Sequence, residues 1–188
     1  MDSKDSQCIR SYIPSVFGFT TSTTIKMSIA LNKDIENSPL LFIQGEQNRF
    51  IALEMVKKQI RFLWNLGDTT AVITHPIKMQ IGDPKKEDDW YHIEANRTLN
   101  VGSLSVRRII KNSAVDNAAV VSNSSKIEFT RLVLNPTSRI WLGGVPAELK
   151  QPEMLSSDVD GLGLIVHQVS LTLIQYELYL VIILLIFF

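Results

Sequence analysis

The 188-residue chain is poor in cysteine, in histidine and in net charge. Its single cysteine, Cys8, excludes both a disulfide framework and a cysteine-rich zinc site within the chain itself. The three histidines, His75, His92 and His167, are too far apart in the sequence to show metal-ligand spacing. Nineteen basic residues balance nineteen acidic ones. This balance argues against nucleic acid as a partner, because binding to phosphates requires an excess of Lys and Arg.

Sustained helical periodicity is also missing, and apolar residues alternate with polar ones instead. Ile25, Met27 and Ile29 are separated by Lys26 and Ser28, which places one apolar face on an extended strand. Similar short segments recur between Gly, Pro, Asn, Asp and Ser residues, which favour turns. Such spacing predicts an all-β protein, an antiparallel β-sandwich. The segments expected to be strands are 25–31, 50–56, 60–64, 77–81, 91–95, 102–106, 127–134 and 140–142.

Three features refine this prediction. The polar pair Lys57-Lys58 separates two apolar segments, which indicates a hairpin. Segment 50–56 (FIALEMV) is apolar enough to face two layers, with Glu54 as its one charged residue. Segment 112–125 is small and polar, so we expect a long loop there. Most of the buried surface is expected from Phe50, Ile51, Leu53, Phe62, Trp64, Ile93, Leu104, Val106, Phe129, Leu132 and Leu142.

The two ends of the chain differ sharply. Residues 1–8 are polar and lack the apolar run of a secretory signal peptide, so by itself this start predicts a cytoplasmic chain. Residues 178–188 are uninterrupted apolar sequence, about half the length of a membrane-spanning helix. Extending the segment back to Leu171 comes close to a full span, which leaves a membrane anchor as one interpretation.

Several segments together resemble a laminin G-like domain, most narrowly the first such module of a laminin α chain. They are CIRSY from Cys8, FIALEMV from Phe50, IRFLWNLG from Ile60, DDWYHIEANR from Asp88, GSLSVRR from Gly102 and IWLGGVP from Ile140. The resemblance implies a curved sandwich of the jelly-roll, concanavalin-like kind. It also implies an adhesion module of the basement membrane, in a parent protein of the extracellular matrix. Its expected partners are integrin- or dystroglycan-type receptors and sulfated, heparan-sulfate-like glycans.

The resemblance covers residues 7–171, which we expect to form an incomplete laminin G-like domain. A complete module would continue with further strands and a closing disulfide, whereas here residues 172–188 form an apolar tail that departs from the family pattern. The tail is interpreted as a misassembled end of the sequence, with a membrane anchor as the alternative. We expect the tail to be unnecessary to the sandwich and to promote aggregation in water.

No motif indicates an enzyme. The acidic cluster Glu87-Asp88-Asp89 lacks the alternating spacing of glycosidase carboxylates, and no G-x-S-x-G elbow occurs. We therefore expect a non-enzymatic module. The alternative is a tail-anchored, lectin-like or carbohydrate-active β-sandwich.

Calcium is the one cofactor that the resemblance raises. Many laminin G-like domains hold it at a rim with two side chains and two backbone carbonyls, and these positions fall on Arg49, Leu66, Val133 and Asn135. An arginine places a fixed positive charge where a calcium ion needs an anionic oxygen. No cofactor is therefore expected, although Asn48 or Asp68 could supply an oxygen to a weak calcium site.

The remaining candidates are basic residues that could bind glycans and asparagines that could carry them. Sulfate groups bind clustered Lys and Arg side chains through charge-assisted hydrogen bonds, and the alternative is that the basic residues of this chain are simply solvated. Two N-glycosylation sequons begin at Asn96 and Asn123, and Asn123 is the better acceptor because it lies in the expected loop. The glycan-binding candidates are Lys57, Lys58, Arg61, Arg107, Arg108 and Lys111.

Overall fold

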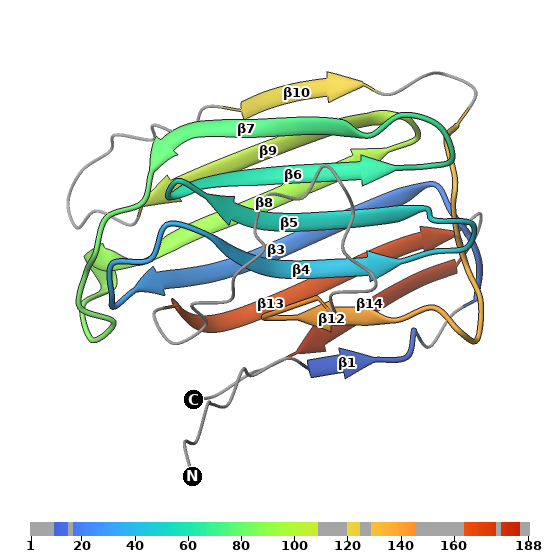
Figure 1. The fold of residues 1–188 in the computed structure, drawn as a ribbon. Coiled ribbons are helices and arrows are strands. Elements are labelled where there is room, and N and C mark those ends of the chain that lie inside the picture. Colours follow the sequence, from blue (N-terminus) through green and yellow to red (C-terminus); the bar gives the residue numbers. More distant parts are fainter. Residues whose placement is uncertain are drawn as a thin grey trace, which may run out of the picture.

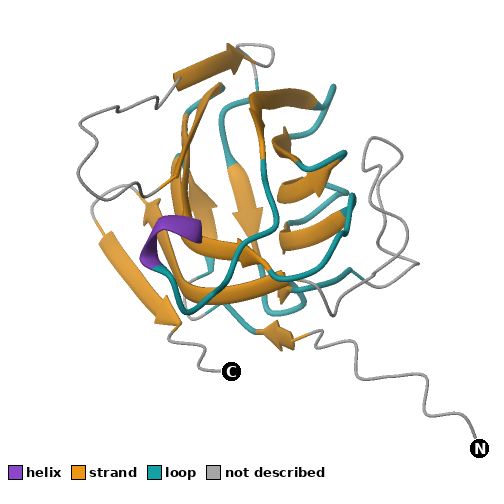
Figure 2. Cartoon of the chain, turned by 90° about the vertical axis from the view of Figure 1, so that its left-hand side faces the viewer, coloured by secondary structure: helices purple, strands orange, loops and turns teal. Residues whose placement is uncertain are grey.

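The alternating segments pair into two six-stranded antiparallel sheets that face each other (Figures 1 and 2). The computed structural model describes residues 10–14, 17–108, 120–124, 129–145, 164–175 and 178–184. The first sheet has the order β1 (Arg10–Tyr12), β12 (Ile140–Leu142), β4 (Ser38–Gln44), β5 (Phe50–Val56), β6 (Gln59–Asn65) and β7 (Ala71–Lys78). The second has the order β10 (Val120–Ser124), β9 (Val101–Arg108), β8 (Tyr91–Thr98), β3 (Ser22–Leu31), β13 (Leu164–Gln175) and β14 (Leu178–Leu184).

Two short elements complete the described chain. Strands β2 (Gly18–Thr20) and β11 (Leu132–Leu134) pair with each other as a small separate sheet. A single turn of 3-10 helix, η1 (Glu87–Asp89), precedes β8 (Figure 2). It is the one helix within the described residues. The predicted all-β sandwich is therefore confirmed.

The core lies between the inner faces of the two sheets. Of the eleven side chains expected to be buried, nine lie in this core, Phe50 is buried on the outer face of the first sheet, and Phe129 is partly buried against the core. Trp64 of β6 reaches across the sandwich to Gly102 of β9, where a Cβ would lie 2.5 Å from the indole. Glycine is therefore required at residue 102 by the close approach of the indole.

The β5–β6 hairpin is confirmed and has a two-residue turn. Val56 pairs with Gln59, and the intervening Lys57 and Lys58 both have positive φ, at 51° and 63°. This is the geometry of a type I′ turn, which matches the twist of the flanking strands. Hydrogen bonds from the two lysine backbone N–H groups to the preceding 36–37 segment hold the turn in place.

Strand β5 is buried on both faces, as its continuous apolar sequence predicts. Its outward-facing Phe50 and Ala52 pack with Phe42 of β4 and Leu63 of β6 in a second apolar cluster. The rings of Phe42 and Phe50 are stacked with centroids 5.5 Å apart. The outer face of the first sheet is thus apolar at its centre.

The structure corrects several predicted strands. Strand β4 was not predicted, and β7 lies earlier than the expected 77–81, with Ile81 51% exposed. In the expected strand 127–134, the strand begins only at Leu132 among the described residues. The long loop expected over 112–125 is wrong at its end, where Val120–Ser124 forms β10 and pairs with β9. The rest of that segment lies outside the described residues.

The end of the chain also differs from expectation. Strand β13 continues through residue 171 to Gln175, with Leu173 in the core at 2% exposure. Residues 172–174 pair with β3, so the boundary expected at 171 falls inside a strand. Seven residues of the apolar tail form β14 and pair with β13 (Figure 1). The start of the domain at residue 7 lies outside the described residues.

A buried arginine fastens the small sheet to the second sheet. Arg97 of β8 is 0% exposed and donates hydrogen bonds to the carbonyl oxygens of Leu99, Thr130 and Thr20. Burial lowers the pKa of Arg97 to about 10, so its guanidinium remains charged at neutral pH. This contact positions the segment just before β11, which contributes to the rim described next.

Candidate functional site

The structure brings the predicted calcium positions to one rim of the sandwich. Arg49 closes a tight turn before β5, in which its N–H donates to the carbonyl of Glu46 over 2.9 Å. A Cβ added to Gly45 would lie 3.0 Å from the carbonyl oxygen of Val133 and 3.1 Å from that of Arg49. The β4–β5 turn and the start of β11 therefore meet, as the resemblance implies.

The side chain of Arg49 fills this rim. Its Nη1 donates to the carbonyl of Arg131, and its Nη2 to Oε1 of Gln47, each over 3.4 Å. Its Nε is buried without a hydrogen bond in the described structure and lies beside Gly67, 3.2 Å from where a Cβ would be. A guanidinium thus stands at this rim, between the carbonyl of Arg131 and Gly67.

The other positions do not fit calcium either. Oδ1 of Asn135 closes its own turn by accepting hydrogen bonds from Thr137 N–H at 2.9 Å and from Ser138 N–H at 2.9 Å. The carbonyl of Val133 accepts the N–H of Glu46 at 2.9 Å. The described residues contain no group of three or more His, Cys, Asp or Glu able to hold a metal. None of the four mapped residues carries a carboxylate, the anionic oxygen that calcium sites usually contain.

Of the six glycan-binding candidates, three are engaged in ion pairs. Lys58 contacts the carboxylate of Asp34. Arg61 lies 2.9 Å from Glu54, and Arg108 lies 2.6 Å from Asp89. These three side chains therefore have limited freedom to bind a ligand.

Arg108 is held especially firmly. It also donates to the carbonyl of Asp88 over 2.8 Å and to Oε1 of Gln80 over 2.9 Å, and its guanidinium lies 5.8 Å from the Tyr91 ring centroid. Together with the N–H of Asp83, which is the larger cause, Arg108 lowers the pKa of Asp89.

The remaining candidates differ in position. Lys57 and Arg107 are exposed, and neither forms an ion pair with another described residue. Lys111 lies outside the described residues. Lys57 is in the β5–β6 turn of the first sheet, whereas Arg107 is on β9 of the second. The basic residues thus do not form one continuous cluster in the described chain.

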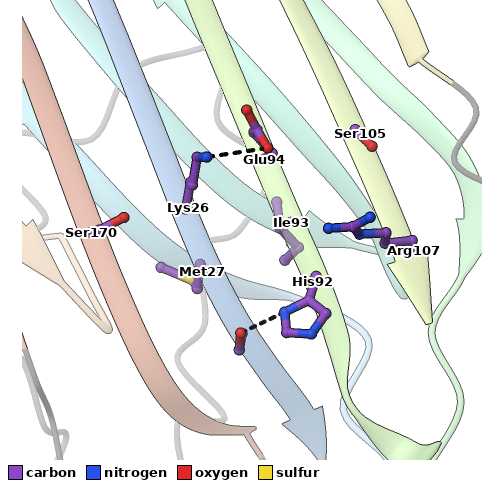
Figure 3. A pocket seen from close by; sticks show the side chains of 9 residues that line it. Lys26, Met27, His92, Ile93, Glu94, Ser105, Arg107 and Ser170 are labelled. Carbon is purple, nitrogen blue, oxygen red and sulfur yellow. Dashed lines mark hydrogen bonds and ion pairs between the residues drawn. The ribbon is translucent and has the colours of Figure 1, made fainter. Parts of the chain in front are cut away.

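Arg107 lines a polar hollow of about 310 Å³ on the outer face of the second sheet (Figure 3). His92 pairs with Ser28 on one side and with Arg107 on the other. The neighbouring row of side chains consists of Lys26, Glu94 and Ser105, with Ser170 opposite Lys26 on β13. Four adjacent strands therefore contribute to the hollow.

Two interactions cross the hollow. Oγ of Ser28 lies 2.7 Å from Nδ1 of His92, and Nζ of Lys26 lies 3.7 Å from Oε2 of Glu94 (Figure 3). Burial, and secondarily the charge of Arg107, lowers the pKa of His92. At neutral pH the imidazole is therefore uncharged, and the cations of the hollow are Lys26 and Arg107.

The two sequons lie on strands β8 and β10, which are separated by β9. Asn96 is half-buried in the middle of β8, and its Nδ2 donates to Oε1 of Glu94 over 3.1 Å. Asn123 is in β10, where it pairs with Gly102, and not in a loop. The reason for preferring Asn123 as acceptor is thereby removed.

Sequence reasoning identified Arg107 but not the other residues of the hollow. Lys26, Glu94 and Ser105 are the outward-facing members of alternating strands, and alternation alone placed them on an exterior face. Which strands lie side by side cannot be derived from alternation. The missing information was the strand order β9-β8-β3-β13.

The family model of the laminin G domain matches residues 33–161. This chain belongs to the laminin G domain family. Laminin G domains of laminin α chains are extracellular adhesion modules and not enzymes. The resemblance inferred from the sequence is thus confirmed.

Curated proteins similar to this chain include laminin α chains. The chain is 31% identical over 149 residues to laminin subunit alpha-1 of Mus musculus, covering 78% of this chain. It is 30% identical over 154 residues to laminin subunit alpha-1 of Homo sapiens, covering 79% of this chain. The chain spans only 4% of the length of each. Laminin α chains are extracellular matrix proteins.

Solved laminin structures share the fold of this laminin G domain. The LG1-3 region of the laminin alpha2 chain superposes with a TM-score of 0.68 at 21% identity, covering 87% of this chain and 30% of that one. Domains LG4-5 of the mouse laminin alpha1 chain superpose with a TM-score of 0.60 at 12% identity, covering 81% of this chain and 36% of that one.

No helix among the described residues is long and apolar enough to cross a membrane.

Proposed function

We propose that this laminin G domain is a non-enzymatic adhesion module of the extracellular matrix. It binds cell-surface receptors of the integrin or dystroglycan type, and sulfated glycans. Membership of the laminin G family and the similarity to laminin α chains support this function. The parent protein is secreted, and Asn96 and Asn123 are its candidate glycosylation sites.

One observation carries the glycan part of the proposal. Lys57 and Arg107 are exposed cations without an ion pair in the described structure, although the chain has equal numbers of acidic and basic residues. A free guanidinium or ammonium can bind a sulfate through charge-assisted hydrogen bonds. Because only these two of the six candidates are exposed and unpaired among the described residues, we expect weak, salt-sensitive binding.

The structure offers no basis for the carbohydrate-active alternative. Among the residues that line the polar hollow, Glu94 is the one carboxylate, and it contacts Lys26 and Asn96. Glycosidases of the ordinary kind need two carboxylates on either side of the scissile bond. The described hollow is therefore suited to binding and not to hydrolysis.

The proposed function is tested with the 188-residue chain. It should be retained on immobilised heparin at low ionic strength and be released as salt is raised. Separately, purified integrin and dystroglycan ectodomains are passed over the immobilised chain, with bovine serum albumin as the control surface. Absence of binding to heparin at low salt, together with absence of binding to either receptor, would refute the function.

A further inference from the structure

The outer face of the second sheet carries an ordered grid of polar side chains. One row runs Ser28, His92 and Arg107 across β3, β8 and β9. The other runs Lys26, Glu94 and Ser105 across the same strands, and Ser170 extends it onto β13 (Figure 3). The adjoining residues Ile25, Met27 and Ile93 point into the core. The alternation of these strands thus fixes the polar side chains in place.

The hollow carries an excess of positive charge and several free hydrogen-bonding groups. Lys26 and Arg107 are cationic, while Glu94 is the one anion among the lining residues. Arg107 forms no hydrogen bond or ion pair with another described residue, so its five N–H donors remain available. The hydroxyl groups of Ser105 and Ser170 likewise have no hydrogen bond to another described residue.

The spacing of the cations indicates the size of the ligand. Lys26 is on β3 and Arg107 is on β9, with β8 between them. Neighbouring strands lie about 4.8 Å apart, so the two side chains start about 10 Å apart across the sheet. A single small anion contacts only one of them, whereas a chain of sugar residues can reach both.

The residues that line the hollow also favour one class of macromolecule, an acidic polysaccharide, over a peptide or a protein. Strands β3, β8 and β9 each pair on both sides, so no strand edge is open here for an added peptide strand. The side chains that point into the hollow are polar or charged, and they include no aromatic anchor besides His92. Protein partners usually rely on such buried anchors. Hydroxyl and cationic groups instead match an acidic polysaccharide.

We propose that this hollow binds an acidic oligosaccharide, with a sulfate or carboxylate group on Arg107 and sugar hydroxyls on Ser105, Ser170 and the Lys26–Glu94 pair. The site rests on the proposed function and goes beyond it by assigning the sugar to a sheet face. The Arg49 rim and the β5–β6 turn lie outside this hollow. The ligand is recognised by its acid groups and its extended polyhydroxyl chain.

The test measures binding of the 188-residue chain to heparin-derived hexasaccharides, to oligogalacturonate and to neutral dextran by titration calorimetry. Arg107→Ala should weaken binding about tenfold, the effect of losing one charge-assisted contact. Arg107→Lys should recover part of it, because the charge remains but the bidentate geometry is lost. Ser105→Ala should weaken binding less than Arg107→Ala. Heparin and oligogalacturonate binding distinguishes sulfate from carboxylate recognition, and dextran should not bind.

Two matched variants serve as controls. Lys33→Ala and Lys78→Ala each remove one exposed positive charge outside the hollow. Both should bind within about twofold of the unaltered chain, because exposed charges at a distance are screened. Far-ultraviolet circular dichroism and the thermal midpoint establish that every variant is folded. In addition, the ring resonances of His92 should shift on titration with the hexasaccharide.

Each outcome bears on the proposal. If the unaltered chain binds heparin but Arg107→Ala and Lys26→Ala bind equally well, the hollow is refuted while the proposed glycan binding stands. If Lys57→Ala alone weakens binding, the site belongs to the β5–β6 turn. If the unaltered chain binds none of the acidic oligosaccharides, the hollow and the glycan part of the proposed function are both refuted.

Discussion

Nη1 of Arg61 lies 2.9 Å from Oε1 of Glu54, across the pairing of β5 with β6. Glu54 is 0% exposed and the Arg61 side chain is 12% exposed. The one charged residue within the apolar segment FIALEMV is therefore compensated by a residue that the sequence suggested as a glycan contact. Arg61 stabilises a buried charge and is not available to bind a ligand.

Removal of one partner of this pair should be strongly destabilising. Arg61→Ala leaves the buried Glu54 carboxylate uncompensated, so we expect the free energy of unfolding to fall by about 3–5 kcal/mol. The double variant Glu54→Leu with Arg61→Leu should lose much less, because it leaves no buried charge. Urea unfolding of the unaltered chain, of Glu54→Leu, of Arg61→Leu and of the double variant measures the coupling. Additive effects of the two single changes would contradict the pairing.

Gly102 should not tolerate a side chain. The methyl group of Gly102→Ala would approach the Trp64 indole to 2.5 Å. Such overpacking lowers stability by about 1–3 kcal/mol. Thermal unfolding measures the loss, and tryptophan fluorescence should report the displaced indole. Ser103→Ala, at the neighbouring half-buried position, is the control. An unchanged midpoint for Gly102→Ala would show that the two sheets are farther apart at this point.

Calcium should not stabilise the protein. The Arg49 guanidinium contacts the carbonyl of Arg131 at the rim, and Asn135 is committed to its own turn. Thermal unfolding curves recorded with calcium and with a chelator should therefore superimpose. An upward shift of the midpoint that grows with calcium concentration would show that a site forms. In that case Asn48→Ala and Asp68→Ala would identify the oxygen donors.

The state of His92 should depend on Arg107. Burial and the Arg107 charge lower its pKa below 6.5, so the folded protein favours the neutral imidazole. This contribution to stability is fully present above pH 6.5 and is lost as the pH falls through the lower, folded-state pKa. Titration of the imidazole ring by nuclear magnetic resonance measures the pKa of His92. Arg107→Gln should raise the pKa, and Lys33→Gln should not. An unchanged pKa of His92 in Arg107→Gln would show that the charge of Arg107 does not influence His92.

Two truncated chains test whether residues 172–188 contribute to the stability of the sandwich and to aggregation. A chain ending at residue 175 keeps Leu173 in the core and the pairs between β13 and β3, so it should fold and aggregate less than the full chain. A chain ending at residue 171 loses these contacts, and we expect it to melt at a lower temperature. Differential scanning calorimetry and light scattering compare them. If the chain ending at 175 is less stable and less soluble than the full chain, β14 is required by the sandwich.

Local patterns predicted the strands with one apolar and one polar face, and also β5 from its continuous apolar sequence, but they missed others, including β4 and β10. Strand β4 (SPLLFIQ) does not alternate because the side chains on both of its faces are buried. Strand β10 consists mainly of small polar residues typical of a loop, and its pairing with β9 satisfies the backbone groups along one of its edges. In both cases tertiary contacts overrode the local signal.

By itself the sequence determined the all-β class and ten of the buried side chains, because alternation assigns each side chain to a face. The Lys57-Lys58 pair predicted the β5–β6 hairpin, and the quoted sequence motifs carried the resemblance to laminin G domains. Only the tertiary structure decided which cations are free and which are paired. Lys26 meets Glu94, and His92 lies between Ser28 and Arg107, through the pairing of strands that are distant along the chain. That register is set by the packing of whole sheets and not by any local pattern.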